Sequence, residues 1–166
     1  MTGRIEVSRS LPPVAIPARL LNELGEHARE TLPEECCGLV TGPTPGTYEN
    51  VHRCRNDMTR LHQQDRAAFP RDGRMAFHMS EADYLRVQRI ADEAGQVVTA
   101  VFHSHADAGA YFSEMDQDFA RQPAFPFPDA HHIVISVVDG LVRESAVFRR
   151  TRDGGFEGRL LVSEAP

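Results

Sequence analysis

Apolar residues recur at helical spacing in two segments of the first hundred residues. From Pro17 to Glu30 they fall on one side of a helix, and Pro17 suits the first helical position because it lacks a backbone N–H. A second helix is expected to begin at Ser80, where Asp83 three residues later resembles a capping box, and to stop at Gly95. The apolar positions of the two helices are Leu20, Leu21, Leu24 and Ala28, then Tyr84, Val87, Ile90 and Ala91.

Short apolar runs predict strands between and after these helices. The clearest run is Q-V-V-T-A-V-F at 96–102, because Val and Thr favour extended backbone. Near the end of the chain, two further runs flank Asp139-Gly140, the strongest hairpin signal in the sequence. The expected strands are Cys36–Thr41, Tyr48–Asn56, Met75–Met79, Gln96–Phe102, His132–Val138, Leu141–Arg149 and Phe156–Val162.

Polar and proline-rich segments separate these elements. Residues 57–73 and 122–129 are expected to be loops, and Ser113 to Gln122 a short helix. Helices that alternate with strands, followed by a run of antiparallel strands, are typical of an α+β protein. We therefore expect a mixed α/β sandwich, with a central sheet flanked by helices. A chain of 166 residues predicts one domain over 1–166, with its core roughly at 16–149.

Composition narrows the class of protein. A hydrophobic content of 41% and a charged content of 25% are ordinary for a globular chain, and no apolar run is long enough for a signal peptide or a membrane span. The net charge of −6 argues against a nucleic-acid partner, because phosphate contacts need a basic face. An odd count of three cysteines, with Cys36 and Cys37 adjacent, argues against a disulfide framework. A cytoplasmic location fits these features best.

The most informative stretch is V-F-H-S-H-A-D-A-G-A-Y-F-S-E-M-D, which ends at Asp116. Alternate residues of an extended chain point to the same side, so His103 and His105 can face one point. Ser113 would be the N-cap of the next helix and Asp116 its third residue, beside the positive end of the helix dipole. Two imidazoles and a carboxylate make a three-ligand zinc set that leaves a fourth position for water.

Each part of this stretch also has a simpler structural explanation. A His-x-His pair is often surface or core histidine, and Ser-x-x-Asp is a plain capping box. Glu34 and Glu35, upstream, could both be solvated charges. The combination of the histidine pair with Ser113 and Asp116 at this spacing is what favours a metal site. His131 and His132 are expected to pack or to face solvent.

The pattern H-S-H-x7-S-x-x-D, together with the upstream E-x-C-G, resembles the JAMM/MPN+ (JAB-domain) zinc metalloprotease family, in particular its small prokaryotic members. The similarity covers roughly Ile16 to Arg149, and the order of elements also matches. This resemblance implies that His103, His105 and Asp116 bind one Zn2+ per chain. It further implies that Glu35 is the general acid/base and that Ser113 hydrogen-bonds to the developing oxyanion.

Two details of the resemblance concern single positions. The family places its glutamate three residues before the glycine, and Gly38 therefore selects Glu35 over Glu34. The family usually has proline after its second histidine, where this chain has Ala106. Proline stiffens the chain but binds no metal, so the change concerns the rigidity of the loop rather than the ligands.

The function that the resemblance implies is hydrolysis of a peptide or isopeptide bond at the C-terminal tail of a ubiquitin-like or sulfur-carrier protein. Residues 57–73 and 106–112 are the expected walls of a substrate groove, where a tail could add to a sheet edge as a strand. One alternative is a non-catalytic interaction scaffold of the same fold. Another is a hydrolase that uses Cys36 or Cys37 as its nucleophile with a histidine base.

Overall fold

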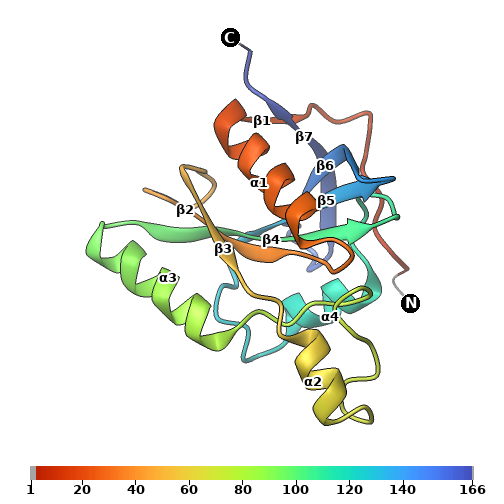
Figure 1. Ribbon diagram of the computed structural model, residues 1–166. Helices are drawn as coiled ribbons and strands as arrows, with labels where there is room; N and C mark the ends of the chain where they lie inside the picture. Colours follow the sequence, from red (N-terminus) through yellow and green to blue (C-terminus); the bar gives the residue numbers. More distant parts are fainter. Residues whose placement is uncertain (1–2, 166) are drawn as a thin grey trace.

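The computed structural model describes residues 3–165 and contains a curled seven-stranded sheet with the strand order β1-β7-β6-β5-β4-β2-β3 (Figure 1). Neighbouring strands are antiparallel except for two parallel pairs, β1 with β7 and β4 with β5. The strands are β1 (Val14–Ile16), β2 (Cys37–Gly42), β3 (Asn50–Cys54), β4 (Val97–Ala106), β5 (His131–Val138), β6 (Leu141–Arg150) and β7 (Phe156–Ser163).

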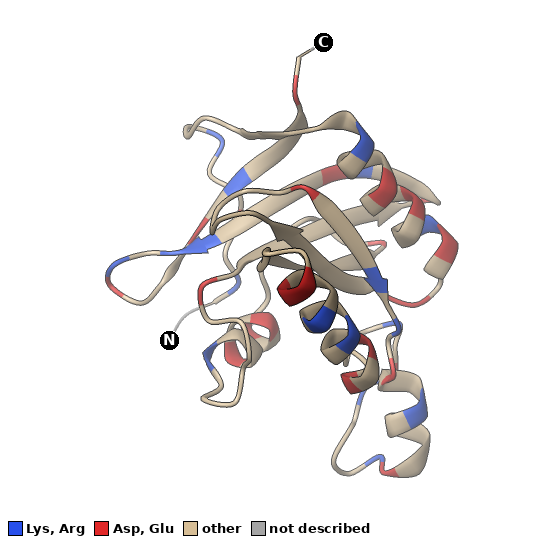
Figure 2. Ribbon diagram, turned by 90° about the vertical axis from the view of Figure 1, so that its left-hand side faces the viewer, with Lys and Arg blue, Asp and Glu red and all other residues tan. Residues whose placement is uncertain are grey.

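Helices lie on both faces of the sheet. Figure 1 shows α1 alone on one face, with α3 and α4 on the opposite face and α2 beyond them. The helices are α1 (Ala18–Thr31), α2 (Met58–Gln64), α3 (Glu81–Glu93) and α4 (Glu114–Arg121). This arrangement is the predicted mixed α/β sandwich. Acidic and basic residues are interspersed along α1 and along α3 (Figure 2).

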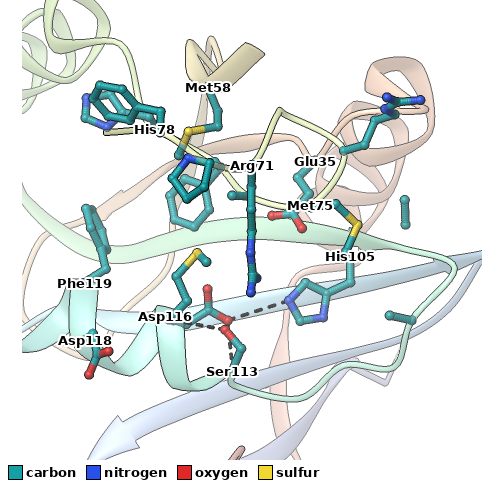
Figure 3. A pocket seen from close by; sticks show the side chains of 18 of the residues that line it. Glu35, Met58, Arg71, Met75, His78, His105, Ser113, Asp116, Asp118 and Phe119 are labelled. Carbon is teal, nitrogen blue, oxygen red and sulfur yellow. Dashed lines mark hydrogen bonds and ion pairs between the residues drawn. The ribbon is translucent and has the colours of Figure 1, made fainter. Parts of the chain in front are cut away.

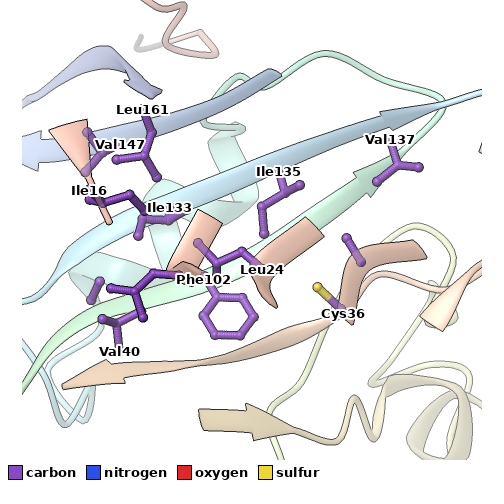
Figure 4. Packing of buried hydrophobic residues seen from close by; sticks show 13 residues of the cluster. Ile16, Leu24, Cys36, Val40, Phe102, Ile133, Ile135, Val137, Val147 and Leu161 are labelled. Atoms are coloured by element: carbon purple, nitrogen blue, oxygen red, sulfur yellow. The ribbon is translucent and has the colours of Figure 1, made fainter. Parts of the chain in front are cut away.

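The sheet separates two hydrophobic cores, because successive residues of a strand point to opposite faces. On the α1 face, Phe102 packs with Leu24 and Cys36 (Figure 4). On the other face, Val101 belongs to a cluster beneath α3, and Phe148 to a second cluster beneath α4. The same alternation carries His103 and His105 to the face of α3 and α4. The fold therefore decides on which side of the sheet the metal-ligand candidates lie.

Most predicted elements are confirmed, and the differences lie in polar or short segments. The strand β1 was not predicted, because three residues are too few to show the alternation of apolar and polar positions that marks a strand. The strand β3 is shorter than the expected Tyr48–Asn56. The strand β4 does not end at Phe102 as expected; it runs on through both histidines to Ala106, which pairs with Val137 of β5. Within residues 3–165, no helix combines the length and the apolar character that crossing a bilayer would require.

The segment between β3 and α3 contains the largest corrections. Residues 57–73 are not one loop, because α2 occupies part of them. None of the residues of α2 is buried, so its sequence lacks the apolar periodicity from which a helix can be predicted. Residues 75–79 form no strand, and only Met79 makes an isolated bridge, to Asn56. The Asn56 side chain instead bonds to the Ala76 carbonyl (3.1 Å) and the His78 N–H (3.0 Å), groups that a neighbouring strand would otherwise engage.

The two predicted capping boxes have different outcomes. Ser80 is the N-cap of α3, but its side chain makes no capping bond. Asp83 instead accepts a hydrogen bond from the backbone N–H of Arg55 (2.8 Å), which ties α3 to the end of β3. At α4 the box is complete, with Ser113 as the N-cap and Asp116 as its partner.

Candidate metal centre and the pocket around it

Three buried side chains converge at the end of β4. His103, His105 and Asp116 offer ligand atoms that all lie within 4.8 Å of one another, and they are the only such group of three or more among residues 3–165. The two Nε2 atoms are 3.2 Å apart, and they lie 3.2 and 3.7 Å from Oδ2 of Asp116. The side chains are at most 9% exposed. The structure therefore brings together the three residues that the sequence singled out.

The two imidazoles are oriented by their surroundings. Nδ1 of His105 donates a hydrogen bond to the Gly109 carbonyl (2.8 Å), which leaves the lone pair of Nε2 facing the cluster. His103 stacks on Phe77, with the ring centroids 4.6 Å apart. Ser104 lies between them in sequence, and its hydroxyl accepts from the Cys36 N–H (2.8 Å), as expected for a residue that points away from the cluster.

Asp116 is held in place by the first turn of α4. Its Oδ2 accepts from the Ser113 N–H (3.0 Å), and its own N–H donates to the Ser113 hydroxyl oxygen (3.0 Å). Burial alone would raise the pKa of Asp116, but the adjacent His103 and His105 outweigh burial and hold it well below its ordinary value. Asp116 is therefore a carboxylate. Burial alone would lower the pKa of His103, but the attraction of the imidazolium to Asp116 outweighs burial and leaves that pKa raised.

Glu35 lies at the other side of the same site (Figure 3). It is 7% exposed, and burial raises its pKa to about 8, although the nearby His103 acts in the opposite direction. Its backbone is fixed, because its N–H donates to the Gly73 carbonyl (2.7 Å) and its carbonyl accepts from the Asn56 amide (2.9 Å). Glu34 has a different environment: its carboxylate accepts from the Thr59 hydroxyl (3.0 Å) and does not line the pocket.

Asn56 supports the site, and sequence reasoning missed it. Its amide N–H donates to the Glu35 and Ala76 carbonyls, and its Oδ1 accepts from the N–H of His78 and from that of Met58, the first residue of α2 (3.0 Å). One side chain thus joins the segment just before β2, the start of α2 and the segment that follows α2. No spacing rule identifies such a residue, since a polar residue after a strand is ordinary.

The loop after His105 is tied to the neighbouring hairpin. The Asp107 N–H donates to the Val137 carbonyl (2.7 Å), and the Ser136 hydroxyl donates to the Ala108 carbonyl (2.6 Å). The Asp107 carboxylate also accepts from the Asp139 N–H (3.1 Å). These bonds fix the exit from β4 without the proline that Ala106 replaces.

A pocket of about 510 Å3 opens over the cluster. Its walls include Met58 and Phe69 to Arg71 on one side and Ala106 to Tyr111 on the other, so the two expected wall segments do line it. Residues 74–78 and the first turns of α4 add walls that were not expected. Methionine and phenylalanine side chains make much of this surface apolar. Its polar groups include those of Glu35, Arg71, Arg74, His78, His105, Ser113, Asp116, Asp118 and Gln122.

The donor set fits a zinc ion better than the alternatives. Two imidazole nitrogens and one carboxylate are typical of a catalytic zinc, whereas Mg2+ and Ca2+ prefer oxygen ligands alone. Burial raises the pKa of the Cys36 and Cys54 thiols to about 12 and that of Cys37 well above its ordinary value. Such thiols stay protonated, which argues against a cysteine nucleophile.

The other histidines behave as expected. His132 is buried among Phe112, Phe125 and Phe156, and burial lowers its pKa to about 3, so it remains neutral. His131 pairs with the Tyr48 hydroxyl. Neither belongs to the ligand cluster. His78 lines the pocket but also lies outside that cluster.

Comparison with known proteins bears on both fold and activity. Residues 17–151 match the sequence model of the family described as prokaryotic homologs of the JAB domain. The chain is 27% identical over 147 residues to proteins named CysO-cysteine peptidase from Mycobacterium bovis and Mycobacterium tuberculosis, which covers 81% of this chain and 89% of each relative.

Two solved structures share the fold. Protein DSY2949 from Desulfitobacterium hafniense superposes with a TM-score of 0.64 at 23% identity, over 92% of this chain and 94% of that one. A protein from Salinibacter ruber gives 0.62 at 22% identity, over 92% and 93%. At these identities the likeness establishes the mixed α/β fold alone.

Proposed function

The chain belongs to the family of prokaryotic homologs of the JAB domain, as the motif predicted, and from this premise we propose that it is a zinc-dependent peptidase acting on the C-terminal tail of a sulfur-carrier protein. The observation that carries the proposal is the convergence of His103, His105 and Asp116 beneath an open pocket. The three would hold Zn2+ through two nitrogens and one oxygen, with a coordination position left toward the pocket.

The chemistry divides between the metal and the side chains around it. A bound zinc ion lowers the pKa of a water ligand from about 16 to about 7 and polarises a carbonyl. Glu35 would take the proton of the attacking water and return it to the amine that leaves. The pKa of Glu35 is about 8 when no metal ion is bound. A zinc ion nearby would lower this pKa and so favour the carboxylate form, which can accept the proton.

Ser113 would stabilise the oxyanion. Its hydroxyl oxygen accepts from the Asp116 N–H (3.0 Å), an interaction that uses a lone pair and leaves the hydroxyl proton free. Ser113 also lines the pocket. It can therefore cap α4 and donate to a developing negative charge at the same time, an effect worth roughly 3–4 kcal/mol for one well-placed donor.

The substrate class is suggested by the relatives. Their name, CysO-cysteine peptidase, describes the removal of cysteine from a carrier protein. An extended tail could enter between the wall segments 57–73 and 106–112, with the bond to be cut above the zinc ligands. Against the non-catalytic alternative, the chain retains His103, His105 and Asp116 as one cluster, and Glu35 and Ser113 line the pocket beside it.

A chelation experiment tests the proposal. Purified protein should carry about one zinc per chain by elemental analysis and should release cysteine from a sulfur-carrier protein whose Gly-Gly terminus is extended by that residue. Treatment with 1,10-phenanthroline should abolish release and added Zn2+ should restore it, while iodoacetamide should have no effect on the enzyme. His105→Ala should lose the metal and the activity together. Release that survives complete removal of metal would refute the proposal.

A further inference from the structure

Arg71 extends from the segment after α2 into the pocket over the zinc-ligand candidates (Figure 3). Its guanidinium points toward the side of the pocket on which His105 and Asp116 lie. It is also close enough to Glu35 for its positive charge to act on that carboxylate. Arg71 therefore brings a permanent positive charge to the place where the reacting bond would lie.

This charge has no partner within residues 3–165. Neither a hydrogen bond nor an ion pair engages the Arg71 side chain there, whereas Arg60 and Arg74 are paired. Arg74, the other arginine that lines the pocket, forms an ion pair with Asp72 (2.9 Å), and Arg60 pairs with Asp57 (3.3 Å). An arginine presents five N–H donors in a planar fork that matches a carboxylate. Arg71 is thus free to bind one from outside.

The remaining charges of the pocket explain why such a donor is needed. Glu35, Asp116 and Asp118 line the pocket and bring carboxyl groups to it, while Asp116 would be neutralised by zinc and Arg74 is already paired with Asp72. The carboxylate of a chain terminus lies beyond the bond that zinc would engage, and Arg71 is the unpaired cation of the pocket that could meet it. A lysine isopeptide or an internal peptide bond brings no carboxylate at that position and would have no use for the cation.

We propose that Arg71 binds the free α-carboxylate of the residue that leaves, so that the pocket accepts a chain terminus and removes a single C-terminal amino acid. This inference rests on the proposed function. Hydrolysis breaks the C–N bond of the terminal peptide, adds the OH of water to the acyl carbon and a proton to the α-nitrogen, and the carboxylate held by Arg71 leaves unchanged with the free amino acid. Arg71 would thereby select terminal peptide bonds over isopeptide and internal bonds.

The test compares two substrates that differ only in the terminal charge. One is a sulfur-carrier protein extended by cysteine, and the other is the same protein extended by cysteinamide. Wild type should prefer the free carboxylate by about tenfold or more in kcat/KM, as expected for a charge-assisted bidentate contact. Arg71→Ala should bring the ratio close to one at unchanged zinc content, and Arg71→Lys should retain part of it.

Arg66→Ala is the matched control. Arg66 belongs to the same segment, carries the same charge and is exposed like Arg71, but it does not line the pocket. This variant should keep the wild-type ratio. An equal loss on both substrates in Arg71→Ala would overturn the inference, because Arg71 would then act on the reacting carbonyl or on the shape of the pocket. Wild type without preference would overturn it as well.

A binding experiment separates this inference from the proposed function. In the Glu35→Gln background, the Kd of the cysteine-extended and cysteinamide-extended carriers can be measured by calorimetry without turnover. Tighter binding of the carboxylate that disappears in Glu35→Gln/Arg71→Ala supports the role of Arg71 even if wild type hydrolyses neither substrate. Equal Kd values in both backgrounds would count against Arg71, whatever the enzyme hydrolyses.

Discussion

At the scale of single residues, burial assigns different properties to two neighbouring glutamates. Glu35 is enclosed in the pocket, where burial raises its pKa to about 8, whereas the Glu34 carboxylate bonds to the Thr59 hydroxyl outside the pocket. A carboxyl group with a pKa near the working pH can both accept and return a proton. Of the two glutamates, we therefore propose Glu35 for the proton-transfer role.

Substitution by glutamine distinguishes the two residues. Glu35→Gln should retain zinc but lose hydrolysis by about 10²–10⁴-fold, because an amide cannot accept the water proton. Glu34→Gln should remain close to wild type, since the amide oxygen can still accept from Thr59. Zinc content and kcat measured on both variants check this. A loss of turnover in Glu34→Gln with an active Glu35→Gln would reverse the assignment.

At the scale of elements, the N-terminus of α4 would connect the stability of the helix to the proposed catalysis. The Ser113 hydroxyl caps the helix that carries Asp116, a contribution of about 1 kcal/mol. Ser113→Ala should therefore lower the melting temperature modestly and turnover strongly, with zinc content nearly unchanged. Ser113→Asp should restore the cap yet remain inactive, because it places negative charge where negative charge develops. Wild-type turnover in Ser113→Ala would leave the hydroxyl with a capping role alone.

The helices and strands also show which parts of the fold and of the site could be predicted from the sequence. His103 and His105 could be placed on one face, since strand alternation is a local rule, and the Ser113–Asp116 box is a local pattern too. The helix α2 could not be predicted, because it buries none of its residues. The position of Arg71 in the pocket likewise depends on how that segment folds over the site, and on contacts of Asn56 that no spacing encodes.

At the scale of the whole molecule, the site joins parts of the chain that are distant in sequence. The ligand candidates come from β4 and α4, Glu35 precedes β2, and residues 68–78 close the pocket from the other side. Because this convergence buries ionisable groups, the proton equilibria of the site are linked to the stability of the entire fold.

Glu35 makes this linkage measurable in protein freed of metal by a chelator. Its pKa in the fold, about 8, lies above the ordinary value of 4.5, so between these pH values the folded chain keeps a proton that the unfolded chain releases. The contribution of Glu35 to the free energy of unfolding therefore falls as pH rises through this window, by at most about 1.4 kcal/mol per pH unit.

Glu35→Gln cannot ionise and lacks this contribution, while every other titrating group is common to both proteins. Denaturant unfolding at pH 5, 6, 7, 8 and 9 should therefore show that the free energy of unfolding of the variant gains on that of wild type up to about pH 8 and then runs parallel to it. Glu34→Gln is the control and should follow wild type throughout. Parallel curves for Glu35→Gln and wild type across the whole range would mean that the fold does not hold Glu35 in its protonated form.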